Sequence, residues 1–406
     1  MMEEQLSTKK NFTAMNIGTF FCLYIAQYIP MTFIMTALQV TMRQDHYSLS
    51  AIGLLNLAKL PWQFKFRHSA SGHHWPFSAP HDFKRAIIFS ETVYALSVIL
   101  IGFLDLGHDL YLVLALVFIS MLASATQDNI TDAFAILSFD KSERGNLNGW
   151  RSMGRYAGSF VGSGVLIMML HSYGWKVIFP CLGFFTFILA VPLIMNENIQ
   201  IKEKSRKQKA KLADFIWFFS QRQIWPQIGF LLLYFVGILG ILSMIRPYMV
   251  DKGFNLKEIG FMIGIIGTMG SIIMAWVAGK LVHRLGIHRS RILVAVMIIL
   301  APLYFLGMSM TATTMVTLII GILFLKICHA SASIVVYTSA MNCVREGREA
   351  TDFAVQVAII HFTGMLIAVL AGPVGQLFDY QGLFIIEAVI AVISLVYVLI
   401  VFKDKK

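Results

Sequence analysis

Four ionisable residues lie within long apolar stretches, where a charged side chain is costly. Asp128 and Asp132 precede the charged turn at residues 140–144, and Arg151 and Arg155 follow it. Each pair is spaced i, i+4 and therefore shares one face of a helix. The pairs are also mirror-related about the turn, so in an antiparallel membrane hairpin each carboxylate lies at the depth of one guanidinium. Ionisable groups at that depth are by default candidates for a functional site.

The chemistry that such a set can perform is reversible protonation. Burial favours the neutral form of a carboxyl group, whereas a neighbouring guanidinium favours the charged form. If Arg151 or Arg155 approaches and leaves Asp128 or Asp132, proton affinity switches with the movement. The alternative that the sequence leaves open is a static clamp between the two helices.

Other polar side chains are isolated in apolar surroundings and are candidates for lining a substrate cavity. Lys326 is too deep in its segment to snorkel comfortably, so it faces either a wet cavity or a carboxylate. The glutamines line a cavity or bond to a neighbouring helix, and for Glu387 pairing with another helix is favoured over a transport role. The cavity candidates are Gln27, Gln39, Gln127, Lys326, His329, His361 and Glu387. Lys59 is interpreted as a snorkelling lysine.

Composition explains why these groups must be positioned by membrane helices. The 406 residues are 57% apolar and only 14% charged, with a mean hydropathy of +0.71. A soluble fold of this length needs more charge on its surface, and a membrane-spanning helix needs about 20 apolar residues. Twelve apolar segments are predicted, at 13–40, 48–66, 85–105, 109–138, 146–170, 175–195, 223–250, 257–283, 290–309, 313–341, 350–377 and 381–402.

The positive charges behind the net charge of +11 are placed so that they orient the chain in its membrane. Lysine and arginine gather in alternate connections. By the positive-inside rule, this places both termini and the central connection on the cytoplasmic side of a cell membrane. Nucleic-acid binding is disfavoured, since no basic and aromatic patch lies on a soluble domain. The basic run at 202–211 is expected to be a solvated linker that fixes topology, with contact to anionic lipid as the alternative.

A track of small residues follows the charged turn. Gly154, Gly158 and Gly162 recur every four residues, a spacing that lets a second helix approach closely. Arg151 and Arg155 fall within or beside the same arc, so they are expected to face protein rather than lipid. Drug–proton antiporters typically carry a proline in this track. None is present here, which disfavours that class of transporter.

An internal repeat divides the chain. Residues 48–53 align with residues 255–260 at an offset of 207 positions. The predicted domains are a six-helix bundle at 1–195, a linker at 196–222 and a second six-helix bundle at 223–406. Gly279, Arg284, Gly286 and Arg289 form a glycine- and arginine-rich cytoplasmic motif between two helices of the second half.

Several motifs resemble the major facilitator superfamily, in the branch that contains muropeptide permeases and acetyl-CoA transporters. The most specific is Ser-Ala-Thr-Gln-Asp-Asn-Ile-Thr-Asp-Ala at residues 124–133, which is similar to that branch's fourth-helix signature. Residues 37–40, 52–55, 60–66, 143–145 and 350–353 extend the resemblance over essentially the whole chain. It implies an all-α membrane fold of twelve helices in two pseudo-repeated bundles. The sequence departs from the branch at residues 67–80, where a polar, histidine-containing stretch replaces the usual first cytoplasmic turn.

The function expected from these observations is secondary active transport by alternating access, with proton coupling. The resemblance implies a small polar or anionic solute that is muropeptide-like. An exporter of another solute and a non-transporting membrane sensor are the alternatives. No nucleotide-binding loop or hydrolase constellation is visible, so neither ATP nor enzymatic activity is expected. The four cysteines have no metal-ligand spacing, and we expect no cofactor, no metal and a monomer, with protons and membrane lipid as further partners.

Overall fold

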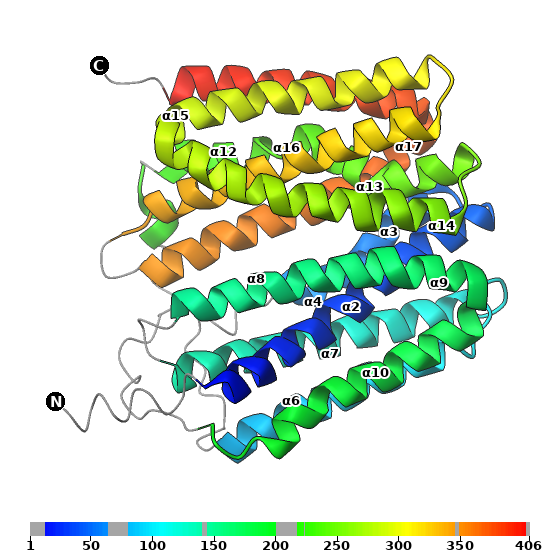
Figure 1. The fold of residues 1–406 in the computed structure, drawn as a ribbon. Coiled ribbons are helices and arrows are strands. Elements are labelled where there is room, and N and C mark those ends of the chain that lie inside the picture. The colour runs from blue at the N-terminus through cyan, green and yellow to red at the C-terminus, as the bar shows by residue number, and fades with distance from the viewer. Residues whose placement is uncertain are drawn as a thin grey trace. The chain divides into compact units, whose positions relative to one another are not determined.

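The computed structural model describes residues 13–63, 80–139, 144–199, 217–222, 224–345 and 349–402, and the regular structure within these ranges is helical (Figure 1). Three predicted features lie largely outside the described residues: the charged turn 140–144 except Arg144, the divergent stretch 67–80 except its last residue, and most of the predicted linker. The chain groups into two compact units, Met1–Ala37 with Arg67–Lys209 and Leu38–Phe66 with Ala210–Lys406. The predicted bundle boundaries refer to the internal repeat and stay a prediction.

The helices of the first unit follow one another with short connections from α6 to α10, and the last seven residues of α2 belong to the second unit. They are α2 (Ala14–Gln44), α6 (Pro80–Ile101), α7 (Leu110–Ser138), α8 (Arg144–Phe160), α9 (Leu166–Tyr173) and α10 (Trp175–Met195), with a π-helical turn, η2 (Val161–Val165), between α8 and α9.

The second unit contains the remaining helices. They are α3 (Leu49–Leu54), the 3₁₀ turn η1 (Leu55–Lys59), α4 (Leu60–Gln63), α12 (Ile224–Leu233), α13 (Val236–Asp251), α14 (Leu256–Ile259), the π-helical turn η4 (Gly260–Ile266), α15 (Gly267–Ser309), α16 (Met315–Asn342) and α17 (Glu349–Val401).

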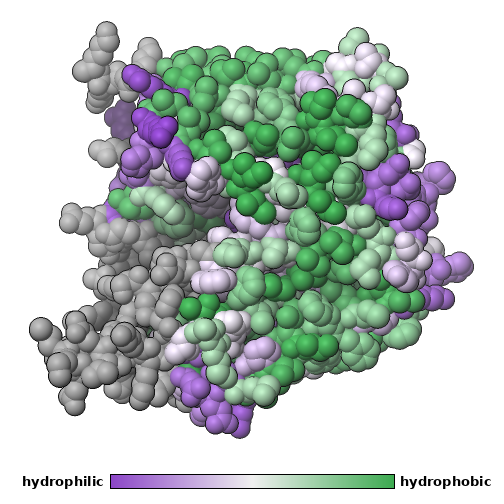
Figure 2. All heavy atoms as spheres, viewed as in Figure 1, coloured by the Kyte–Doolittle hydropathy of each residue, from purple (hydrophilic) through white to green (hydrophobic). Residues whose placement is uncertain are grey.

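Within the described ranges, eight helical stretches are long and apolar enough to cross a membrane. The stretches that contain α15 and α17 are interrupted at Gly286 and Asp379, where the backbone leaves helical geometry, so each forms two rods. With the rods taken separately, and with α6 and the α3–α4 segment added, the described chain contains the twelve segments that the sequence predicts. Figure 2 shows hydrophobic side chains covering the visible helical surface and hydrophilic side chains near the helix ends, as a lipid-facing protein requires.

Glycine forms two of the sharp turns between helical rods, because it adopts this backbone geometry most readily. Gly286 has φ 77° and ψ 163°, and Gly174, between α9 and α10, has φ 76° and ψ 171°. These values explain why glycine is needed there, since a Cβ atom makes this region unfavourable. Asp379 adopts the same type of turn with φ 57° and ψ 179° and is therefore strained.

Close helix contacts in the first unit depend on the predicted glycine track. A Cβ atom on Gly154 would lie 2.9 Å from the Cβ of Tyr24, and one on Gly158 or Gly162 would collide with Tyr28 or Thr32. The Thr32 hydroxyl donates to the Gly158 carbonyl oxygen over 2.9 Å. Because partners and glycines ascend together by four residues, α2 and α8 run parallel in contact, which is the role of small residues in membrane helices.

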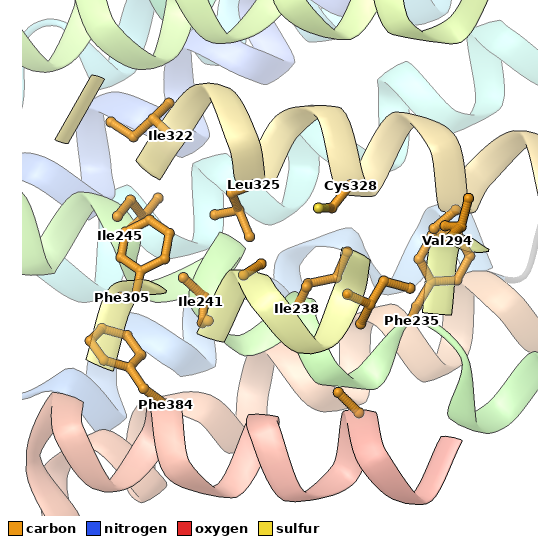
Figure 3. Close-up of a cluster of buried hydrophobic side chains, with 14 of the residues drawn as sticks. Phe235, Ile238, Ile241, Ile245, Val294, Phe305, Ile322, Leu325, Cys328 and Phe384 are labelled. Atoms are coloured by element: carbon orange, nitrogen blue, oxygen red, sulfur yellow. The ribbon is translucent and has the colours of Figure 1, made fainter. Parts of the chain in front are cut away.

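The second unit has the larger apolar core, built mainly from α13, α15, α16 and α17. Figure 3 shows Ile241 and Ile245 on α13 converging with Phe305 of α15 and Leu325 of α16. A second close approach joins α3 to α17, where the Cα of Gly372 would lie 3.1 Å from a Cβ added to Gly53. Residues 38–63 are thereby packed as part of this unit.

Candidate functional site

One arginine of the first unit bridges two carboxylates. The Nη2 atom of Arg151 on α8 lies 3.1 Å from Oδ2 of Asp132 and 3.4 Å from both oxygens of Asp128 on α7. The Asp128 side chain is fully buried, whereas those of Asp132 and Arg151 are 21% and 31% exposed. The i, i+4 spacing on α7 is what lets one guanidinium reach both carboxylates.

Aromatic residues of α2 complete the surroundings of this cluster. The Arg151 guanidinium lies 5.7 Å from the centre of the Tyr24 ring, within cation–π range, and the Tyr24 hydroxyl interacts with the Asp132 carboxyl group. Tyr24 is also the residue against which Gly154 packs. The glycine track therefore brings the aromatic face of α2 to the guanidinium. The contacts at 3.4 Å are long for charged hydrogen bonds, so a small helix movement changes which carboxylate Arg151 serves.

The side chain of Arg155 is placed differently from that of Arg151, four residues earlier on the same helix. Its side chain is exposed, with the guanidinium carbon 5.2 Å from the Tyr156 ring centre. Asp128 interacts with Arg151 instead of the mirror-related Arg155. Equal depth does not fix the direction of a side chain around its helix, and the Arg155 guanidinium lies by Tyr156 of its own helix whereas that of Arg151 lies by Tyr24 of α2.

Two of the predicted cavity residues lie buried in the first unit. The side-chain amides of Gln27 on α2 and Gln127 on α7 have no hydrogen-bond partner among the described residues. The Tyr94 hydroxyl of α6 donates to the Gln27 backbone carbonyl over 3.2 Å. Buried amides without partners are costly, and their presence is typical of a polar binding region.

A cationic cluster occupies the second unit. Arg246 on α13 is near enough to Lys59 at the end of η1 and to Lys326 on α16 for electrostatic interaction with both. Its Nη1 atom donates to Oε1 of Gln39 over 3.0 Å, and the Lys59 ammonium donates to Oδ1 of Asn56 over 3.0 Å. We call Lys59, Arg246 and Lys326 the cation cluster.

The described residues supply no carboxylate that balances the cation cluster. Within the described residues none of its three members forms an ion pair, and the buried Nε of Arg246 lacks a hydrogen-bond partner. Three like charges in a half-buried region repel one another unless an anion joins them. This arrangement can bind a carboxylate or a phosphate group, for which arginine supplies a two-pronged donor.

Two members of this site were not anticipated from the sequence. Arg246 lies near the end of its predicted segment, and Lys59 was interpreted as snorkelling. The repeat contains the missed signal, because adding the offset of 207 to Gln39 gives Arg246, the residue that Gln39 contacts.

Irregular turns occur at equivalent positions of the repeat within this unit. The 3₁₀ turn η1 ends at Lys59, and the same offset of 207 places Lys59 on Ile266, the last residue of η4. A Cβ on Gly267, the next residue, would lie 3.2 Å from Cγ of Lys326. Irregular helical turns are frequent at functional sites, and here each adjoins one lysine of the cation cluster.

The other cavity candidates of the second unit are dispersed. The His329 ring lies 5.7 Å from the Phe235 ring, and Nε2 of the exposed His361 lies 3.0 Å from the Tyr337 hydroxyl. Glu387 is buried, and its carboxylate accepts the backbone N–H groups of Gly240 and Ile241 near the start of α13. That contact matches the helix-pairing alternative for Glu387.

The cytoplasmic motif surrounds the interruption of α15. Gly286 forms the turn itself, whereas Arg284 and Arg289 flank it with exposed side chains. A Cβ on Gly279 would meet no atom within 4 Å, so this glycine is not required by packing inside the unit.

Known proteins share this architecture. The crystal structure of the nucleoside transporter NupG matches with a TM-score of 0.75 at 13% identity, over 97% of this chain and 100% of that one. A bacterial homologue of the human lysosomal transporter Spinster matches with a TM-score of 0.73 at 14% identity, over 95% of this chain and 96% of that one.

Sequence relatives point to one branch. The anhydromuropeptide permease of Escherichia coli K12 is 21% identical over 391 residues, which are 93% of this chain and 78% of the relative. Putative transporter AmpG 1 of Rickettsia conorii is 22% identical over 387 residues, 88% of this chain and 90% of the relative. The sequence profile of the Major Facilitator Superfamily matches residues 19–358. This chain therefore belongs to the Major Facilitator Superfamily and is a membrane transporter of a small-molecule solute, not an enzyme.

Proposed function

We propose that this chain is a secondary active transporter that carries an anionic, muropeptide-like solute by alternating access, coupled to protons. It acts in the cytoplasmic membrane with both termini in the cytoplasm. The observation that carries the proposal is the cation cluster, in which Arg246 interacts with Lys59 and Lys326 and none of the described residues adds a neighbouring carboxylate.

An anionic solute supplies the missing counter-charge. A muropeptide joins sugars to a short peptide and so presents carboxylates together with hydroxyl and amide groups. Its carboxylates fit the cation cluster, and Gln39 next to Arg246 offers a polar contact for the uncharged part. Similarity to the anhydromuropeptide permease supports this solute class over a nucleoside or a neutral sugar.

Proton coupling is assigned to the cluster of Asp128, Asp132 and Arg151. While the guanidinium serves both carboxylates, each is stabilised in its charged form. When rocking of the helices moves Arg151 away, the fully buried Asp128 loses its counter-charge and gains affinity for a proton. Binding and release of the proton then follow the conformational cycle.

The experiment is uptake of radiolabelled anhydromuropeptide into proteoliposomes, with and without an inwardly directed proton gradient. We expect gradient-stimulated uptake that excess unlabelled muropeptide inhibits and the peptide-free sugar does not. Signals equal to those of empty liposomes would contradict transport and favour a sensor.

Two substitutions test the assigned residues. Arg246→Met should raise KM about 10- to 100-fold, since charged hydrogen bonds are lost, while Arg222→Met, which removes an exposed arginine, should leave KM unchanged. Asp128→Asn should abolish stimulation by the proton gradient, and undiminished coupling would refute the role of Asp128.

A further inference from the structure

The first unit contains another buried carboxylate, Glu91 on α6, that the arginine-bridged cluster does not include. Its side chain is 1% exposed, and neither carboxylate oxygen has a hydrogen-bond partner among the described residues. Glu387, the buried glutamate of the second unit, differs because backbone N–H groups bind both of its oxygens. A buried ionised carboxylate without a partner is strongly unfavourable, so Glu91 is stable in this environment only when protonated.

Contacts between α6 and α7 place Glu91 close to the level of the arginine-bridged carboxylates on α7. Phe83 of α6 stacks on Phe134 of α7 at 5.3 Å, and the hydroxyl groups of Tyr94 and Ser124 are neighbours farther along the same two helices. Because α6 and α7 are antiparallel, these two pairs place Glu91 opposite residues 126–127, which are Thr126 and Gln127, with Asp128 the next residue along α7.

Polar groups without partners gather at this level. The amides of Gln27 and Gln127 and the Thr131 hydroxyl are buried and unpaired among the described residues. Tyr94, one turn beyond Glu91 on the same helix, interacts electrostatically with it and bonds to the backbone of Gln27. This is a polar interior region rather than a part of the apolar core.

In the part of the chain that the structure describes, no other ionisable group neutralises Glu91. The helices packed against α6 in this unit are α2, α7 and α10, and Tyr94 is the residue of its own helix that faces it. The ionisable residues that these three helices contribute to the unit are Cys22, Tyr24, Tyr28, Tyr111, Asp128, Asp132, Lys176 and Cys181. None forms a hydrogen bond or ion pair with Glu91, and both aspartates are served by Arg151.

We propose that Glu91 is a proton-binding site of the transporter, which holds the proton in the conformation where Arg151 keeps Asp128 and Asp132 ionised. The inference rests on the proposed proton coupling and adds the carboxyl group that holds the proton in this conformation. When Arg151 moves away, Asp128 close to the same level becomes the competing acceptor. The Glu91 oxygen then releases its proton to water that the same movement admits, this water solvates the new carboxylate, and an Asp128 oxygen accepts a proton from it; no other bond changes.

Glu91→Gln tests the inference, because glutamine resembles the protonated carboxyl group but cannot release a proton. In proteoliposomes we expect solute exchange under equal solute and equal pH to persist, and accumulation driven by the proton gradient to fall at least tenfold. Glu197→Gln is the control, since it removes an exposed glutamate carboxylate of the same unit, and it should keep the pH dependence.

A second variant covers the case in which Glu91→Gln does not fold. Glu91→Asp keeps a titratable group in a shifted position, so gradient-driven accumulation should persist with an altered pH profile. Gradient-driven accumulation by Glu91→Gln equal to wild type, or an unchanged pH profile in Glu91→Asp, would overturn the inference. If wild type itself shows no gradient-driven uptake, the proposed proton coupling fails instead.

Discussion

Arg151 and Arg246 are both partly buried arginines on membrane-spanning helices, yet their surroundings differ. Arg151 in the first unit contacts two carboxylates and an aromatic ring, whereas Arg246 in the second unit is near two lysines and a glutamine. Charge in the first cluster is balanced by carboxylates of the protein, whereas no described residue supplies a carboxylate to the second, which is why we propose that the solute balances it. Residue type and depth alone therefore do not define the role of a membrane arginine, because its partners decide that role.

The largest expected effect comes from removing the guanidinium that the protein itself balances. Arg151→Met leaves Asp128 buried without its counter-charge, which should lower the free energy of unfolding by about 3–5 kcal/mol. Thermal unfolding in detergent measures the loss. Arg155→Met removes the neighbouring exposed arginine and should change stability by no more than about 0.5 kcal/mol. Equal effects of the two substitutions would refute the assigned bridging role.

A smaller loss should follow when the helices that hold Arg151 are separated. Gly158→Leu forces a side chain into Tyr28 on α2, and overpacking of this kind costs about 1–3 kcal/mol. It also displaces α2 from α8 and so weakens the contact of Tyr24 with the guanidinium. Gly307→Leu is the control, since a Cβ there meets no atom within 4 Å. If both variants unfold at the same temperature, the glycine track does not hold α8 against α2.

The opposite sign is expected in the cation cluster. Arg246→Met removes a positive charge that repels Lys59 and Lys326, although it also removes the bond to Gln39. The free energy of unfolding without solute should stay level or rise by about 1 kcal/mol. Thermal unfolding with added muropeptide completes the measurement, because the solute should stabilise wild type and not the variant. A destabilisation as large as that of Arg151→Met would erase the contrast between the two arginines.

The helices themselves could be predicted from the sequence. The segments at 109–138 and 175–195 correspond to α7 (Leu110–Ser138) and α10 (Trp175–Met195), since long apolar runs end where polar loops begin. The break at Gly286 falls in the predicted connection between 283 and 290. Irregular turns such as η2 and η4 were not predicted, because they depend on packing against other helices rather than on local pattern.

The candidate sites were only partly predictable. The spacing predicted that Asp128, Asp132 and Arg151 lie at similar depths in the membrane. Equal depth does not say in which direction a side chain points, and the Arg155 guanidinium lies by Tyr156 instead. Arg246 was hidden by its place near the end of an apolar segment, where arginine ordinarily reaches the membrane surface. Glu91 was missed because a lone glutamate in a helix has no pattern, and only the burial of both oxygens shows that it is unpaired.

Asp105 extends the comparison to a carboxylate outside the membrane and should give the smallest effect. In the loop between α6 and α7 it accepts the Gly107 N–H over 2.8 Å, with His108 at 3.6 Å, and these contacts hold the pKa of its carboxyl group below the ordinary value. A group whose pKa falls on folding stabilises the fold above its unfolded pKa, and the contribution is lost as pH falls through the folded pKa. Asp105→Asn should therefore lower the midpoint temperature of thermal unfolding slightly at neutral pH. In acid the variant should unfold at the same temperature as wild type. A difference in midpoint between variant and wild type that persists in acid would mean that the side chain acts through packing. Because the carboxylate is exposed to solvent, we expect an effect well below that of Arg151→Met.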